Sequence, residues 1–230
     1  MCPAAAGPPY QTDDPEPTDY RNWEIYTGVD YQYRSGDGAT ASLPFAEFNY
    51  GALPNVQVSA SLPIQFDSSG AARAFGYGAT DFGIKLRFVQ ESNTRPQISF
   101  YPSVEIPAAG GSLQTLLPLW IQKSEGPWTA FGGGGITVNA GAGRHDSSFV
   151  GAALERQLSP GTAIGAEFYH DSSDAPAAAG TTDFNVGAIA SLGELHALLF
   201  SIGRSLGGAH AFQFYSSYEF KLGPKEPAAR

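Results

Sequence analysis

Residues 23–34 read WEIYTGVDYQYR, a stretch in which two kinds of side chain alternate. One set of positions holds Trp23, Ile25, Thr27, Val29, Tyr31 and Tyr33, and the other holds Glu24, Tyr26, Gly28, Asp30, Gln32 and Arg34. Every charged residue therefore falls on the same side of a period of two, which is the period of a β-strand. The stretch predicts a strand with one apolar face and one polar face.

The same alternation returns along the rest of the chain. It is clear at 55–67, 81–88, 97–106 and 212–222, and fainter at 41–50, 113–124, 128–139, 148–158, 162–170, 182–192 and 196–205. Glycine and proline are concentrated between these segments, as is typical of turns. Together the segments predict an all-β chain of about twelve strands of roughly ten residues each.

The composition favours a membrane barrel over a water-soluble sandwich. Only 15% of the 230 residues are charged, which leaves few for a water-facing shell. The mean hydropathy is -0.17, and no stretch approaches the ~18 to 20 apolar residues of a membrane-spanning helix. Barrel strands escape such a scan because only every second residue faces lipid. We therefore predict an antiparallel up-and-down transmembrane β-barrel in the bacterial outer membrane.

The connections indicate how the barrel would be oriented. Those at 51–54, 90–96, 124–127, 159–161 and 193–194 are mostly short, as periplasmic turns are, whereas 67–79 and 171–181 are longer, as extracellular loops are. Aromatic girdles are expected at Tyr20, Trp23, Tyr50, Phe88 and Trp128 on the periplasmic side and at Tyr31, Tyr33, Phe66, Phe149 and Phe168 on the outer side.

Three regions follow from this orientation. We expect residues 1–20 to be an N-terminal periplasmic segment or short plug, 21–222 to be the barrel, and 223–230 to be a periplasmic C-terminal tail. Residues 1–7 lack the basic and apolar regions of a signal peptide, so we expect the export signal to be absent from this chain.

Charge and cysteine content narrow the possible functions. The net charge of -9 and the absence of a basic run argue against a nucleic acid partner. Cys2 is the only cysteine, so neither a disulfide framework nor a zinc-type Cys/His spacing is present. No cofactor-binding or metal-binding residues are predicted.

The polar faces of the strands supply the residues expected to line the lumen. They are Glu24, Tyr26, Asp30, Arg34, Glu47, Asp81, Lys85, Arg87, Tyr101, Glu105, Glu167, Tyr169, Tyr215, Glu219 and Lys221, and Glu155 shares their face. These groups either line a water-filled path that favours cations or pair with one another and block the lumen. A barrel of about twelve strands lies between the filled and the open sizes, so both readings stay open.

Two local motifs suggest chemistry but are better explained structurally. Gly132–Gly135 lacks the Lys, the Ser or Thr and the helix of a phosphate-binding loop, so it predicts strand curvature or room for a bulky lumen residue such as Tyr26. His170-Asp171-Ser172 has the residue types of a hydrolase, but consecutive strand residues point to opposite faces. His196 with Ser201 lacks a nucleophile context. No catalytic residues are predicted.

Several motifs together resemble one known family. They are GPP at 7–9, TDDPEP at 12–17, NYGALPNVQ at 49–57, LRFVQE at 86–91, LPLWIQKS at 117–124, GPWT at 126–129, GGGG at 132–135 and FNVGA at 184–188. In aggregate, over nearly the whole chain, they resemble the family named for the meta-pathway of phenol degradation. The resemblance implies an outer-membrane barrel of transporter type, associated with aromatic catabolism and without known catalytic residues.

The expected function is passive uptake of small hydrophobic or aromatic compounds through an outer-membrane channel. Its expected partners are outer-membrane lipid, small hydrophobic or aromatic solutes and, during biogenesis, the barrel-assembly machinery. The alternatives are a non-conducting structural or adhesive barrel, which would favour long or aromatic loops, and a barrel-embedded lipid hydrolase, which needs converging catalytic groups at one rim.

Overall fold

The computed structural model describes residues 9–36, 38–68, 73–108, 111–175, 179–207 and 211–224. The strands in chain order are β1 Trp23–Arg34, β2 Gly38–Leu53, β3 Val56–Asp67, β4 Ala74–Tyr77, β5 Thr80–Val89, β6 Gln97–Phe100, β7 Ser103–Ile106, β8 Gln114–Glu125, β9 Trp128–Asn139, β10 Ser147–Ser159, β11 Thr162–Asp171, β12 Thr181–Ser191, β13 His196–Gly207 and β14 Ala211–Leu222. In this described part of the chain, no helix is long and apolar enough to cross a membrane.

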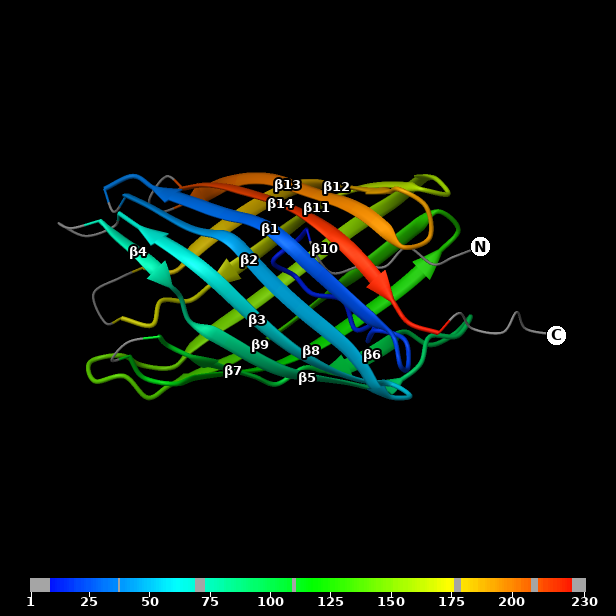
Figure 1. The fold of residues 1–230 in the computed structure, drawn as a ribbon, viewed down its shortest axis with the longest axis horizontal. Helices are drawn as coiled ribbons and strands as arrows, with labels where there is room; N and C mark the ends of the chain where they lie inside the picture. Colours follow the sequence, from blue (N-terminus) through cyan, green and yellow to red (C-terminus); the bar gives the residue numbers. More distant parts are fainter. Residues whose placement is uncertain are drawn as a thin grey trace.

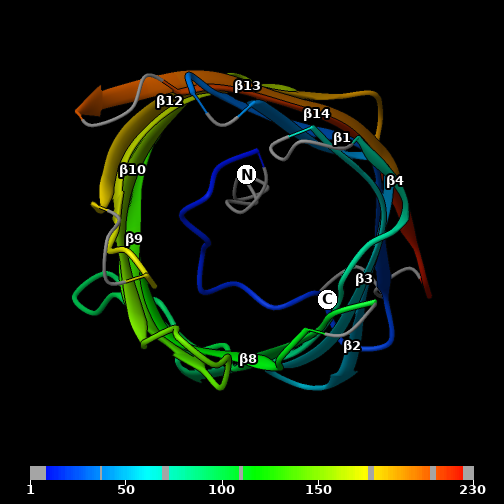
Figure 2. The ribbon, with the colours of Figure 1, turned by 90° about the vertical axis from the view of Figure 1, so that its left-hand side faces the viewer.

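The strands close into one antiparallel barrel (Figures 1 and 2). Closure is made by β1 and β14, which pair along their whole length from Trp23↔Leu222 to Arg34↔Ala211. β4 and β5 both pair with β3, and β6 and β7 both lie between β5 and β8, so each of these pairs is one interrupted wall strand. The wall therefore contains twelve strands, which confirms the predicted fold.

The alternation located most strands well, but it missed β4, which lies within the expected loop 67–79, and the interruption between β6 and β7. The predicted strand at 97–106 is divided at Tyr101-Pro102 because proline has no N–H to give to the ladder. The wall stays hydrogen-bonded there, since the Ile84 amide donates to the Pro102 carbonyl oxygen and the Tyr101 amide donates to the Pro118 carbonyl oxygen. The break therefore bends the strand without opening the wall.

The two ends of the barrel differ in their connections (Figure 1). At one end, the short-turn end, β1 begins, β14 ends, and residues 54–55, 126–127 and 160–161 make tight hairpin turns. Asn55 and Gly126 have positive φ in these turns (66° and 58°), as two-residue hairpin connections require. The other end, the loop end, carries longer connections such as 140–146 and 172–180.

The two faces of the wall have opposite chemistry. Large apolar side chains on the outer face are exposed, among them Phe168 at 59% and Val150 at 58%. The inner face carries fully buried polar side chains such as Glu167 and Glu155. This arrangement, apolar outside and polar inside, is that of a barrel whose outer face is in contact with lipid.

Two sequence-based assignments were wrong in detail. Phe149, expected in the outer girdle, stands on the inner face of β10, where its ring lies 5.8 Å from those of Tyr169 and Trp120. The residues around Phe149 are small, so the alternation in this strand did not show which face was apolar. The room left by Gly133 is filled by Trp120 and not by Tyr26, because a Cβ on Gly133 would lie 2.8 Å from the Trp120 ring.

Candidate functional site

Residues 9–20, called the lumen segment here, lie inside the barrel and follow its wall (Figure 2). One half of the segment is held by β11 and β13. Both oxygens of the Glu167 carboxylate accept backbone amides, one from Gln11 and one from Thr12, each at 2.8 Å. The Ser201 hydroxyl donates to the Pro9 carbonyl oxygen at 2.6 Å.

The other half of the lumen segment is held by β3 and β5. The Lys85 ammonium lies 3.0 Å from a carboxylate oxygen of Asp13 and donates to the Asp14 carbonyl oxygen at 2.9 Å. Arg87 pairs with Glu16 at 3.2 Å. The Thr18 amide donates to the Gln57 side chain at 2.8 Å. The segment is thus attached to widely separated strands of the wall.

Charge is concentrated where the segment meets Lys85. The side chains of Lys85 and Asp14 are almost fully buried, at 5% and 3% exposure. Burial raises the pKa of the Asp14 carboxyl well above its usual range, and the nearby Lys85 ammonium opposes that shift. The Lys85 ammonium also lies 4.9 Å from the centre of the Tyr101 ring. Lys85 is therefore the principal anchor of this half of the segment.

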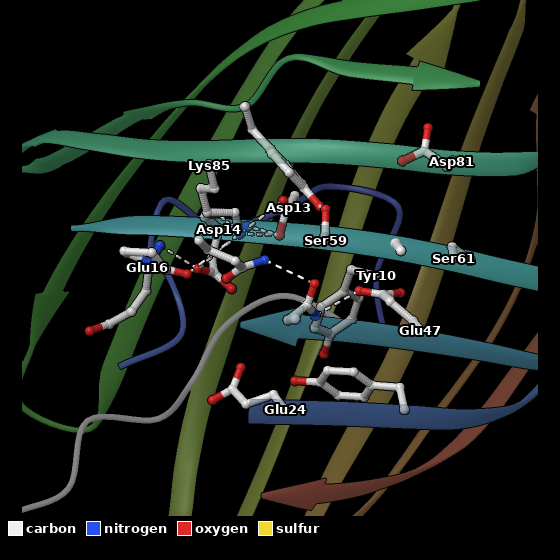
Figure 3. A pocket seen from close by; sticks show the side chains of 16 residues that line it. Tyr10, Asp13, Asp14, Glu16, Glu24, Glu47, Ser59, Ser61, Asp81 and Lys85 are labelled. Atoms are coloured by element: carbon white, nitrogen blue, oxygen red, sulfur yellow. Dashed lines mark hydrogen bonds and ion pairs between the residues drawn. The ribbon is translucent and has the colours of Figure 1, made fainter. Parts of the chain in front are cut away.

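A row of three cavities runs beside the segment along β1–β5. The turn-side cavity, of about 230 Å³, lies between the lumen segment and β1, β2, β3 and β5 (Figure 3). The middle cavity, of about 240 Å³, shares Glu47, Ser61 and Asp81 with it. The loop-side cavity, of about 350 Å³, shares Asp30, Ser42 and Gln65 with the middle one. The shared walls place the three in sequence from the short-turn end towards the loop end.

The linings of these cavities are strongly acidic. Carboxylates come from β1, β2, β3, β5, β7 and the lumen segment, and Figure 3 shows Glu24, Glu47 and Asp81 around the turn-side cavity. Lys85 is the one basic residue among the described residues that line them. Such a lining raises the local concentration of cations and lowers that of anions.

The residues expected to line the lumen fall into two groups in the structure. Nine border the cavities: Glu24, Tyr26, Asp30, Glu47, Asp81, Lys85, Tyr101, Glu105 and Tyr215. The other six are Arg34, Arg87, Glu167, Tyr169, Glu219 and Lys221, which stand on the inward register of their strands and away from the cavity walls. That any of these residues lines a path for solutes stays a prediction.

Most of the second group is engaged in contacts within the protein. Lys221 bridges Glu24 and Glu219 at 3.1 and 3.2 Å, and Tyr26 donates to Glu219 at 2.8 Å, which ties β1 to β14. Tyr169 donates to Gln213 at 2.6 Å. These contacts are the internal pairing that the blocked-lumen alternative requires, but they are confined to parts of the wall.

Sequence reasoning allowed a short plug at 1–20 but named no residue of the lumen segment as part of the site. Tyr10, Asp13, Asp14 and Glu16 border the turn-side cavity, although they belong to no strand. A period of two identifies strand faces only, so it carries no information on an irregular segment. The Asp and Pro content of TDDPEP at 12–17 was the one available signal, and it indicated no contact.

The two candidate hydrolase sets are not assembled. His170 bonds to the Thr182 hydroxyl, while the Ser172 hydroxyl accepts the Ser148 amide. His196 bonds to the Tyr218 hydroxyl, whereas Ser201 binds the lumen segment inside the barrel. In neither set do the named histidine and serine contact each other, so these residues offer no geometry for nucleophilic catalysis.

No family model and no curated protein sequence matches the chain. Its structure is similar to an outer-membrane channel from Pseudomonas putida F1, at 14% identity and TM-score 0.67, covering 90% of this chain and 99% of that one. The fold is that of an outer-membrane β-barrel. The same fold occurs in the KdgM porin in complex with disordered oligogalacturonate, at 9% identity and TM-score 0.62, covering 86% of this chain and 98% of that one. It also occurs in the translocator domain of the autotransporter NalP from Neisseria meningitidis, at 11% identity and TM-score 0.58, covering 89% of this chain and 90% of that one. At these identities the likeness shows the fold alone.

Proposed function

We propose that the protein is an outer-membrane channel for passive movement of small solutes. The observation that carries the proposal is the row of three cavities, which share lining residues and follow β1–β5 between the two ends of the barrel. Residues 9–12 of the lumen segment lie against the opposite wall at β11 and β13, and residues 13–18 cross to β3 and β5, where they border the turn-side cavity. Solutes would move along the β1–β5 side.

The solutes that suit this lining are small aromatic compounds, with a preference for those that carry positive charge. Tyr26, Tyr101 and Tyr215 border the cavities and offer ring surfaces for stacking. The surrounding carboxylates favour cations. This proposal keeps the aromatic part of the sequence-based expectation, as the family resemblance also implies, and keeps the cation preference that the polar strand faces predicted.

Single-channel recording of the refolded protein in a planar bilayer tests the proposal. In a gradient of KCl, the expected result is discrete conductance steps with a reversal potential that reports preference for K⁺ over Cl⁻. Removing one lining carboxylate, in Glu47→Gln or Asp81→Asn, is worth about 1 kcal/mol in a water-filled lumen. The K⁺ preference should therefore fall by up to ~fivefold.

Glu125→Gln is the matched control because Glu125 is exposed at the end of β8, away from the cavities. It should leave the ion preference unchanged. A folded barrel that shows no conductance steps in any of these forms would contradict the channel proposal and would favour a non-conducting structural barrel.

A further inference from the structure

The inner face of β10–β13 is an acidic surface with no basic residue among its wall positions. Four carboxylates stand on it: those of Glu155, Glu167 and Asp183 are almost fully buried, and the fourth, Asp171, lies at the loop end of β11. In the cross-strand rows that contain them, from β10 to β13, no inward position is occupied by Lys, Arg or His. Among the described residues, no salt bridge reaches any of the three buried carboxylates. Their negative charge is therefore not neutralised by the wall.

Several acceptors on this surface lack a donor. Both oxygens of Glu155 are unpartnered although that side chain is 1% exposed, and Asn185 Oδ1 is unpartnered at 2% exposure. Glu155 and Glu167 are close neighbours, since Glu155 pairs with Gly165 and Glu167 pairs with Ala153 on adjacent strands. The Tyr10 hydroxyl, which is also unpartnered, is one donor beside Glu155, and a single hydroxyl cannot fill all of these acceptors. Buried polar atoms are nearly always hydrogen-bonded, so the remaining acceptors indicate that further donors are missing.

The lumen segment covers this surface at positions where the wall has no side chains. A Cβ on Gly187 would lie 2.9 Å from the Tyr10 ring, and one on Gly165 would lie 2.6 Å from the Tyr10 hydroxyl. A Cβ on Gly151 would overlap the Thr12 hydroxyl. The glycines make a shallow seat beside the carboxylates, and the segment supplies the Gln11 and Thr12 backbone amides to Glu167 there.

We propose that the inner face of β10–β13 is a binding site for a small organic cation with at least two N–H donors, of the guanidinium or amidinium class. The ligand would replace the Gln11 and Thr12 amides on Glu167, and its remaining donors would reach Glu155 and Asn185. The inference names a ligand class for the lumen and so rests on the proposed channel function.

The geometry at Glu167 favours this ligand class. The two amides approach separate carboxylate oxygens at equal distances of 2.8 Å, which is the pattern that a guanidinium group makes with a carboxylate. Asn185 already donates to one of these oxygens at 2.6 Å and orients the carboxylate. A metal ion suits the site less well, because no metal-type grouping of His, Cys, Asp and Glu occurs within the described ranges.

Titration calorimetry of the refolded full chain in detergent tests the proposal. Methylguanidinium chloride is the probe, and tetramethylammonium chloride is its matched control because it has the same charge and no N–H donor. The expected result is saturable binding of methylguanidinium that is at least about tenfold tighter than that of tetramethylammonium, since charge-assisted hydrogen bonds are lost with the control ion.

Variants locate the site within the lumen. Glu167→Gln and Glu155→Gln should each weaken methylguanidinium binding by about tenfold or more, whereas Glu125→Gln on the exposed end of β8 should not change it. Thr12→Pro removes one competing amide and should tighten binding by about tenfold. On a denaturing gel, a folded barrel in an unheated sample migrates separately from the heated, unfolded chain. The presence of this folded band verifies that each variant forms a barrel.

Equal affinity for the two cations would overturn the proposal, because it would mean that the acidic lumen binds cations by charge alone. Unchanged affinity in both Glu167→Gln and Glu155→Gln would also overturn it. The measurement does not depend on conduction, so its failure is distinct from failure of the channel function. A protein that conducts K⁺ without binding methylguanidinium keeps the proposed function and rejects this site.

Discussion

At the scale of single residues, Lys85 has the largest effect that the structure predicts. Its buried ammonium contacts the Asp13 carboxylate and the Asp14 backbone, and so joins β5 to the lumen segment. A buried ion pair does not by itself prove high stability, because both charges lose water. Removal of one partner is costly, because the other charge is left buried and unpaired.

Lys85→Met should therefore release the lumen segment from β5. Removal of one partner of a buried ion pair costs about 3–5 kcal/mol. Here the change leaves Asp13 and Asp14 without their cation, so it destabilises the segment bound to the wall relative to the released segment. Limited chymotrypsin digestion of the protein in micelles measures the release, with faster cleavage expected after Tyr10 and Tyr20.

Lys123→Met is the matched control for this change. Lys123 pairs with Glu91 at 2.8 Å near the short-turn end, and its side chain is 40% exposed. Exposed pairs contribute at most about 1 kcal/mol, so cleavage should match that of the wild type. Equal cleavage rates in Lys85→Met and Lys123→Met would show that Lys85 does not hold the segment.

At the scale of elements, the seat for the lumen segment depends on glycines in three neighbouring strands. Gly151, Gly165 and Gly187 lie on β10, β11 and β12, and each would bring an added Cβ against the segment. Glycine in a strand interior is unfavourable on its own, so close approach of another part of the chain is its physical justification here.

Gly187→Ala should lift residues 9–12 from the wall while the barrel stays closed. The added Cβ would lie 2.9 Å from the Tyr10 ring and 3.0 Å from the Pro9 ring, and such overpacking costs about 1–3 kcal/mol. Hydrogen–deuterium exchange of the Gln11 and Thr12 amides, which Glu167 protects, should become faster. Gly207→Ala is the control, because nothing lies within 4 Å of a Cβ added at that position. Exchange that is equally slow in both variants would refute the seat.

The strands themselves were largely predictable from sequence. Residues 23–34 form β1 with the predicted bounds, and 128–139 form β9 with the predicted bounds. β4 was not predicted, because it lies within 67–79, which was expected to be an extracellular loop. The division of β6 from β7 was not predicted either, because an alternating pattern continues across a local kink. Phe149 was placed on the wrong face because its neighbours Ser148, Gly151 and Ala152 are too small to mark one face as apolar.

At the scale of the whole molecule, the barrel should present its tryptophans to two different environments. Trp23 and Trp128 are 40% and 44% exposed on the outer face, whereas Trp120 is 3% exposed on the inner face. Brominated phospholipids quench only tryptophans that are in contact with acyl chains or their interface.

The expected outcome is strong quenching in Trp120→Phe, which keeps the two outer tryptophans, and weak quenching in the Trp23→Phe, Trp128→Phe double variant, which keeps Trp120. Quenching in Trp120→Phe should exceed quenching in the double variant by more than about twofold, because the barrel wall, roughly 10 Å thick, lies between Trp120 and the lipid. Comparable quenching in the two proteins would place Trp120 on the lipid side and reverse the register of β8.

Local alternation was enough to predict the barrel, its approximate strand number and the chemistry of its two faces. This works because the period of two is a property of each strand backbone and needs no knowledge of its partners. The candidate site is different. Glu167 meets Thr12 across 155 positions of the chain, and Lys85 meets Asp13 across 72. Such contacts arise only when β1 and β14 close the wall around residues 9–20, so the path of the lumen segment, the row of cavities and the acidic seat come from the closed barrel and not from any local pattern.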